Sequence, residues 1–300
     1  MSFVDPNPFD FHVHTNLSDS DETLDDLCLE AARAGICHLG VTDHDAVHPH
    51  ETLRAIGQAH GIHVVSGCEV SCYWPTRDGE QAIVHLGAHW LKPHDPDFAQ
   101  VLAHNQGQDF DGRVSALLRA CEKQGLRPYG DTPEANLARI RAAHPTSVHF
   151  GKRAVAQLME ESGCVANRGQ AYELMARGGP AYVPVTDHMR FVGFWDAVEA
   201  IVRNSLCTLN HLYYSGLDKT NEEQLLLDFK DAGGDALESL YHRYTPAQRR
   251  ELALKADALE LMTNAGSDRH DPSRPFIKGH GLMYFALSIR QRQKHGTLWE

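Results

Sequence analysis

Residues 9–14 read FDFHVH, and two similar runs follow, ICHLGVTDHD at 36–45 and IHVVSGCEV at 62–70. Each is a short apolar run typical of a buried strand. Amphipathic stretches typical of helices separate them, at residues 23–35 and 51–61. Thr23 or Ser20 is expected near the start of the first helix, and Gly35 is expected to end it. This alternation predicts parallel strands joined by crossover helices, which is an α/β fold.

The alternation of strand and helix patterns stops in the middle of the chain and then resumes. A further strand is expected at 81–90, but four successive helical patterns follow without a clear strand, at 115–125, 134–143, 152–163 and 170–179. Strand patterns reappear at 205–214, 235–243 and 261–268, with helical patterns between them. The sequence therefore predicts one domain formed by residues 1–98 and 184–300. A helical insertion at 99–183 is expected to cover the active site.

The composition excludes several classes of protein. Apolar residues make up 42% of the chain, which excludes global disorder. Lys and Arg number 28 against 40 Asp and Glu, a net charge of −12, which disfavours binding to long nucleic acids. No run is long and apolar enough for a membrane helix, and the N-terminus does not resemble a secretory signal. We expect a cytoplasmic protein whose seven cysteines are reduced, with no membrane partner and no protein partner that the sequence identifies.

The chain has 20 histidines, and many of them stand where the predicted strands end. His12 and His14 are two residues apart in a strand, so both side chains point to the same side of the sheet. In a parallel barrel the carboxyl ends of the strands share one face, where sites are built. Imidazoles and carboxylates gathered there predict a divalent-metal site. The candidate residues at these ends are His12, His14, Asp19, Asp43, His44, Asp45, Glu69, His85, His211, Asp268 and His270.

Five separated motifs resemble those of the PHP (polymerase and histidinol phosphatase) superfamily. They are HVHTNLSD at 12–19, GVTDHD at 40–45, GCEV at 67–70, VHLG at 84–87 and GSDRHD at 266–271. GGPAYVP at 178–184 resembles the branch that contains 3′,5′-nucleoside bisphosphate phosphatases. The chain departs from the family twice. Asn210-His211-Leu212 replaces the usual Ala-His-Pro, and Val155 stands where a basic motif, Lys152-Arg153 here, usually continues to a histidine.

The resemblance implies a distorted (β/α)7 barrel with three metal ions. By that resemblance His12, His14, Glu69 and Asp268 hold the first metal; Glu69 bridges to the second, which also takes His85 and His211; and Asp19, His44 and His270 hold the third. Such nitrogen-rich ligand sets favour Mn, Fe or Zn over Mg. The ions would leave net positive charge for a phosphate despite the acidic ligands.

The expected chemistry is hydrolysis of a phosphate ester by a metal-bound hydroxide, with Glu69, His44 and Asp268 as catalytic residues. Asp43 and Asp45 either orient imidazoles or cap the helix that follows. Arg113, Lys152 and Arg153 are candidate phosphate-binding cations, and each could instead lie on a solvated helix face. His188 could protonate the leaving group, with His104 and His149 at the mouth of the pocket, although all three could equally be surface histidines.

The leading hypothesis is thus a metal-dependent phosphatase that acts on a small nucleotide such as a 3′,5′-bisphosphate. The first alternative is a 5′-3′ exonuclease that trims short RNA or DNA with the same metals. The second is a metal-bound sensor that binds nucleotides without turnover, for which an incomplete ligand set would be the sign. Histidinol phosphatase is a weaker alternative, because the GGPAYVP region and the insertion favour a nucleotide substrate.

Overall fold

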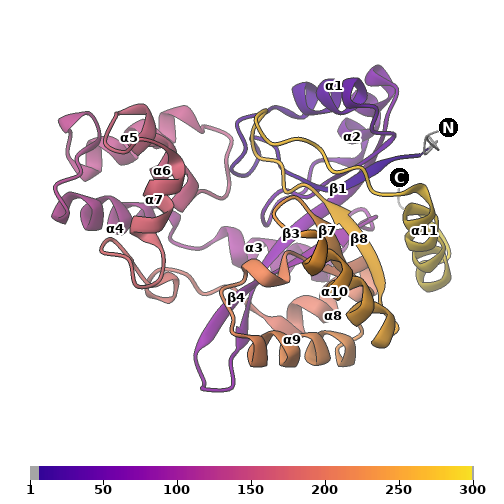
Figure 1. Cartoon of the computed structure of the whole chain (residues 1–300). Coiled ribbons are helices and arrows are strands. Elements are labelled where there is room, and N and C mark those ends of the chain that lie inside the picture. The colour runs from indigo at the N-terminus through magenta and orange to yellow at the C-terminus, as the bar shows by residue number, and fades with distance from the viewer. Residues whose placement is uncertain (1–6, 299–300) are drawn as a thin grey trace. The chain divides into compact units, whose positions relative to one another are not determined.

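Seven strands lie side by side in the order β1-β2-β3-β4-β6-β7-β8 in a computed structural model of the chain, which describes residues 7–298 (Figure 1). A short eighth strand, β5, pairs with β3. Every pairing is parallel except those of β4 with β3 and with β6. The strands are β1 (Phe9–Val13), β2 (His38–Val41), β3 (His63–Pro75), β4 (Gln81–His89), β5 (Val192–Gly193), β6 (Leu206–Leu209), β7 (Ala236–Tyr241) and β8 (Met262–Gly266).

The first and last strands of this series meet and nearly close the sheet. Val13 forms a parallel bridge with Arg269, just beyond β8. The backbone N–H of Asp268 donates to the carbonyl of His12 at 2.7 Å, and that of His14 donates to the carbonyl of Arg269 at 2.9 Å. The predicted distorted α/β barrel of seven strands is confirmed.

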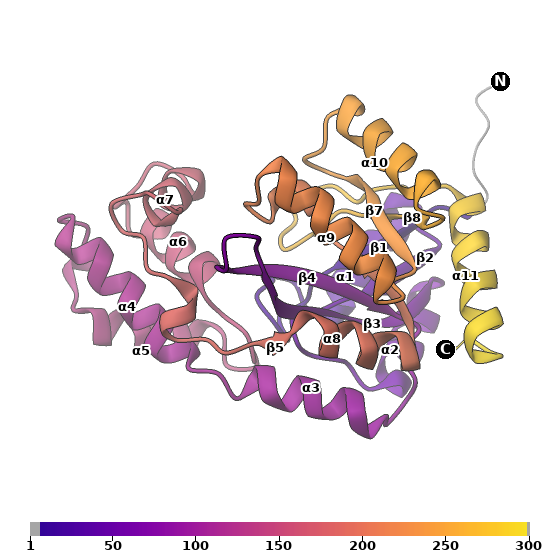
Figure 2. The same cartoon turned by 90° about the horizontal axis from the view of Figure 1, so that it is seen from below.

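Helices pack around the outside of this sheet (Figures 1 and 2). α1 begins as predicted, because the side chain of Thr23 accepts a hydrogen bond from Asp26 N, and it ends at Gly35, whose φ of 76° suits glycine. Leu27 of α1 is fully buried beside the strand residues Val13 and Leu39. The helices are α1 (Leu24–Ala34), α2 (His50–His60), α3 (Pro96–Gln106), α8 (Phe194–Asn204), α9 (Lys219–Asp231), α10 (Pro246–Ala258) and α11 (Gly281–His295).

The hairpin of β3 and β4 differs from the expected all-parallel order. β3 continues past Glu69 to Pro75, and β4 returns beside it with Ser71 opposite His85. Only five residues separate the two strands, which is too few for a helical crossover. A strand in this position can pair only as an antiparallel hairpin.

Residues 106–190 form a second compact unit, here called the inserted unit; residues 1–105 and 191–300 form the barrel unit. The inserted unit contains the four expected helices and two short 3₁₀ turns. Its apolar residues Val114, Leu117 and Val155 are fully buried. The helices are α4 (Phe110–Lys123), α5 (Pro133–Ala143), α6 (Lys152–Glu161) and α7 (Arg168–Met175). That this unit covers the active site stays a prediction.

Within residues 7–298, none of the helices combines the length and the apolar character that crossing a bilayer requires. The cytoplasmic location expected from the sequence stays a prediction.

Candidate metal centre

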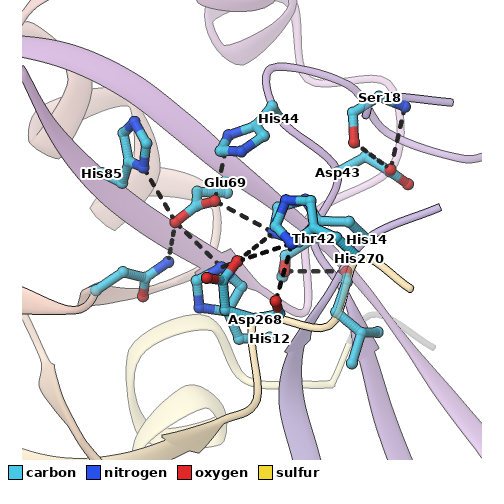
Figure 3. A network of polar contacts seen from close by, with 12 residues as sticks. His12, His14, Ser18, Thr42, Asp43, His44, Glu69, His85, Asp268 and His270 are labelled. Atoms are coloured by element: carbon cyan, nitrogen blue, oxygen red, sulfur yellow. Dashed lines mark hydrogen bonds and ion pairs between the residues drawn. The ribbon is translucent and has the colours of Figure 1, made fainter. Parts of the chain in front are cut away.

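The centre is built around Glu69, which β3 places at the carboxyl end of the barrel strands with no exposed surface. Its carboxylate lies in the middle of a ring of imidazoles (Figure 3). Five histidine nitrogens approach its two oxygens: His12 Nε2 at 3.1 Å, His14 Nε2 at 3.3 Å, His44 Nδ1 at 3.2 Å, His85 Nδ1 at 3.5 Å and His211 Nε2 at 3.0 Å.

The first two of these histidines come from the strand that begins the barrel. His12 is in β1 and His14 directly follows it, and both side chains point toward Glu69, as the two-residue spacing predicts (Figure 3). Gly266, at the end of β8, makes this approach possible. A Cβ at that position would collide with His12 and with Glu238, so only glycine fits between them.

Nine predicted ligands lie together in this region. Three overlapping sets each offer ligand atoms within 4.8 Å of one another: His12, His14, Glu69 and Asp268; His14, Asp19, His44 and His270; and His44, Glu69 and His85. The first set is identical to the predicted first metal site. His211 joins through contacts with Glu69 and, at 3.3 Å, with His85. The division of the nine residues among individual ions stays a prediction.

The donor set fits divalent metal ions. Several buried ligand-type atoms make no hydrogen bond within the described residues, among them His12 Nε2, His14 Nε2 and Glu69 Oε2. Buried polar atoms are normally satisfied, so atoms left open and aimed at one another are suited to an ion. Imidazole nitrogens mixed with carboxylates favour first-row transition metals.

The electrostatics of the cluster favour positive charge at its centre. Burial alone would raise the pKa of the Glu69 carboxyl, but His12 and His44 hold that pKa well below its ordinary value. Burial alone would lower the pKa of His14, yet contacts with Asp268 and Glu69 raise it to about 9. Either protons on the imidazoles or bound cations can supply the charge that these carboxylates demand.

His85 reaches the centre by a different route from the one expected. It was grouped with residues at the carboxyl ends of strands, but it lies in the middle of β4, whose range agrees with the strand expected at 81–90. Because β4 runs antiparallel to β3, a residue in its middle lies at the carboxyl ends of the parallel strands. His85 therefore faces Glu69 from within a strand.

Asp43 and Asp45 organise the loops of the centre, and the helix-capping alternative is wrong. Asp43 accepts a hydrogen bond from Ser18 Oγ at 2.6 Å (Figure 3) and one from Thr15 N at 2.8 Å, which fixes the loop that carries Asp19. Asp45 accepts from Ser71 N at 3.0 Å and from Asn105 Nδ2 at 2.7 Å. The following helix, α2, begins after Pro49 without a side-chain cap.

Two further buried polar residues support the ligands and were not predicted. Glu238 Oε1 lies 2.8 Å from His12 Nδ1, and its Oε2 accepts a hydrogen bond from His211 N at 2.8 Å. Asn210 donates from Nδ2 to Glu69 Oε1 at 2.9 Å. A carboxylate on the far nitrogen of a ligating histidine fixes the tautomer and the ring orientation. The signal in the sequence was an acid inside the apolar run ALESLY of β7.

The predicted substrate cations belong to the inserted unit. Arg113 is buried and donates from Nη1 to the carbonyls of Val183 at 2.5 Å and Pro184 at 2.9 Å. Lys152 lies near it: burial and the charge of Arg113 lower the pKa of this lysine. Arg153 follows in the first turn of α6. Their contact with a substrate stays a prediction.

The three histidines proposed for the pocket mouth occupy different environments. His188 Nδ1 lies 3.9 Å from Asp109 Oδ2, within the inserted unit. The ring of His149 packs 4.7 Å from that of Phe110, whereas His104 is exposed on α3 of the barrel unit. A role for any of them in proton transfer stays a prediction.

The part of the chain that carries His12, His44 and Glu69 matches a known protein family. Residues 10–111 match the model of the PHP domain. The chain is 26% identical to a 5′-3′ exoribonuclease of Haemophilus influenzae, with 88% of this chain and 90% of that protein covered. It is 26% identical to a 3′,5′-nucleoside bisphosphate phosphatase of Chromobacterium violaceum (88% and 87% covered). It is 27% identical to a phosphoribosyl 1,2-cyclic phosphate 1,2-diphosphodiesterase of Eggerthella lenta (87% and 93% covered).

A solved structure shares the fold. The chain superposes on an amidohydrolase from Chromobacterium violaceum, solved with bound sulfate, with a TM-score of 0.79 and 24% identity over 90% of each chain. That likeness extends beyond the domain match at 10–111 and covers both halves of the barrel unit.

Proposed function

Because this chain belongs to the PHP superfamily and is a metal-dependent phosphoesterase, we propose that it hydrolyses a phosphomonoester of a small nucleotide, such as a 3′,5′-bisphosphate. The observation that carries the proposal is Glu69, a fully buried carboxylate in contact with five imidazoles. A carboxylate so placed offers an oxygen to more than one ion. The overlap of the three ligand sets supports a count of three ions, with Mn, Fe or Zn as the candidates.

Divalent ions at such a centre activate water near neutral pH and offset the negative charge of the phosphoryl oxygens. The residues of the chain supply the geometry. Glu69 and His44 each belong to two ligand sets, so they would help to hold neighbouring ions if the sets are filled. Asp268 has a second oxygen outside the ligand set, and Glu238 holds the ring of His12. The proposed hydrolysis uses no serine or cysteine nucleophile.

The preference for a nucleotide is assigned to the inserted unit. Lys152 and Arg153 stand in the first turn of α6, and we propose that these cations contribute to binding a second phosphate that is not cleaved. The net charge of −12 supports a small substrate over a long polynucleotide.

Exonucleolytic trimming of short RNA is the second candidate, because a similar protein from Haemophilus influenzae is named a 5′-3′ exoribonuclease. The sensor alternative has less support, since the ligand cluster has no gap among its nine predicted members.

The test is a substrate panel assayed with manganese-loaded protein. The panel contains a 3′,5′-bisphosphate nucleoside, the matching 5′-monophosphate, a ribose 1,2-cyclic phosphate and a 5′-phosphorylated oligoribonucleotide. We expect the bisphosphate to have the highest kcat/KM, by about tenfold or more over the monophosphate. Fastest turnover of the oligoribonucleotide would establish the exonuclease instead. Binding of nucleotides without release of phosphate would establish the sensor.

A further inference from the structure

The two oxygens of Asp268 face different partners. Oδ1 points to the imidazoles, 3.3 Å from His14 Nε2 and 3.2 Å from His270 Nδ1. Oδ2 has two donors on the other side, Tyr241 Oη at 2.9 Å and Arg274 Nη1 at 2.9 Å. Asp268 is therefore oriented through Oδ2 by a phenol and a guanidinium, and Oδ1 is left to face the imidazoles of the centre.

Arg274 stands on a loop that is firmly anchored. Its backbone N–H donates to the carbonyl of Asp271 at 3.1 Å, and its own carbonyl accepts from Arg269 Nη1 at 2.7 Å. Arg269 is in turn buried in a two-fold contact with the carboxylate of Glu22, at 2.7 and 2.8 Å. The guanidinium of Arg274 is thus held at a fixed place beside the centre.

Only part of that guanidinium is engaged by the protein. Nη1 contacts Asp268 and lies 3.4 Å from His270 Nδ1, whereas Nε and Nη2 have no hydrogen-bond partner within residues 7–298. The side chain is 19% exposed, so these remaining donors reach solvent next to the ligand cluster. A guanidinium has five donors in a rigid plane and can bind a carboxylate and a phosphate oxygen together.

We propose that Arg274 is a substrate-binding residue that donates to a non-bridging oxygen of the phosphoryl group held at the metal centre. The proposal rests on the proposed function and adds to it a cation supplied by the barrel unit itself. Asp268 holds the guanidinium in place through Nη1, and in this proposal the remaining N–H groups offset part of the phosphoryl charge. The class of ligand is a phosphate monoester or the inorganic phosphate released from it.

Tyr241 supplies the matched control. It donates to the same oxygen of Asp268 at the same distance, but it is 3% exposed and has no second donor. Loss of either residue removes one support of Asp268. Only loss of Arg274 also removes the further N–H donors that the proposal assigns to the substrate.

The experiment compares Arg274→Met, Arg274→Lys and Tyr241→Phe with the parent protein, all loaded with manganese and with metal content measured. The readout is the affinity for inorganic phosphate, determined by isothermal titration calorimetry, which needs no turnover. We expect Arg274→Met to lose about ten- to a hundredfold in phosphate affinity and Arg274→Lys to lose less. Tyr241→Phe should stay within about threefold of the parent, even where its metal affinity falls.

Equal losses of phosphate affinity in Arg274→Met and Tyr241→Phe, or no loss in either, would overturn the proposal. A parent protein that binds no phosphate would overturn it too. The proposed function is tested separately by the substrate panel: phosphate binding that depends on Arg274 in a protein that cleaves no nucleotide would support this inference and contradict the function.

Discussion

The barrel unit and the inserted unit use charged side chains in opposite ways. In the barrel unit, Glu69 and Asp268 face several imidazoles inside the fold. In the inserted unit, charged residues pair with local partners at the surface, as in Arg139 with Asp131 and Arg141 with Asp111, each at 2.7 Å. Surface pairs of this kind contribute little to stability. Strand topology concentrates ligands at one place, whereas helices distribute charges over their exposed faces.

The two units also differ in the surroundings of one arginine each, Arg113 in the inserted unit and Arg274 in the barrel unit. Arg113 donates to two backbone carbonyls of its own unit and is 3% exposed, so it supports the backbone of that unit, while its contact with a substrate stays a prediction. Arg274 of the barrel unit was not predicted, yet it lies in contact with Asp268.

Glu69→Gln should have the largest effect and lower kcat/KM by at least about a thousandfold. An amide has one oxygen acceptor and no charge, so it cannot serve two ligand sets as the carboxylate does. Turnover of the bisphosphate and circular dichroism would be measured together. Glu199→Gln, on the exposed face of α8, is the control. Near-normal activity in a metal-loaded, folded variant would show that Glu69 is not the centre of the site.

Glu238→Gln should lower metal affinity by about ten- to a hundredfold, because Glu238 holds the far nitrogen of His12. Competition with a chelator of known affinity would measure the loss. The variant should regain activity at high metal concentration, unlike Glu69→Gln. An unchanged metal affinity would contradict the role assigned to Glu238.

Arg153→Ala tests whether the inserted unit binds the second phosphate, the one that is not cleaved. It should lower kcat/KM about ten- to a hundredfold for a bisphosphate and little for a monophosphate. Arg139→Ala, whose side chain pairs with Asp131 on the same unit, is the control for charge alone. Equal losses on both substrates would assign Arg153 to the scissile phosphate or to the fold, and specificity would then have to come from elsewhere.

The smallest effect concerns histidines at the opposite ends of the strands. Burial and the neighbouring His63 lower the pKa of His38 to about 4, whereas that of His14 is raised to about 9. The folded protein therefore keeps His38 neutral while the unfolded chain protonates it below about pH 6.5. His38 contributes stability that is complete above that pH and is lost as the pH falls toward 4.

Replacing His38 with Gln should remove that pH dependence, on the order of 1 kcal/mol at pH 5. Urea unfolding of both proteins at pH 5 and pH 7 would measure it. The same slope in parent and variant would show that His38 is not responsible. The result would separate histidines that serve the packing of the strands from those that serve the centre.

The ligands were predictable because the chain marks them locally. Most of them stand at or just beyond the end of an apolar run, and the carboxyl ends of parallel strands meet whatever the details of packing. The reversal of β4 was not visible, since an alternating apolar pattern is the same in either strand direction. His85 was still identified, because the motif VHLG resembles that of the family even though the residue lies in the middle of a strand.

The supporting residues were not predictable for a different reason. Glu238 lies within β7 and reaches His12 through the closed sheet, whereas Arg274 lies in a loop without a regular pattern and reaches Asp268 through the fold of that loop. Their partners are 226 residues away for Glu238 and six residues away, around a tight loop, for Arg274. Neither distance leaves a periodic signal. Contacts that depend on tertiary structure alone escape any argument from spacing.

One cluster around Glu69 is proposed to hold several metal ions. The number of metal ions bound per chain is the direct test. The protein would be produced with excess manganese, iron or zinc, freed of loosely bound ions and analysed by mass spectrometry for metal per chain. The overlap of the three ligand sets predicts about three ions per chain in the parent and fewer in Glu69→Gln. No more than one ion per chain in the parent, whichever metal is supplied, would contradict it.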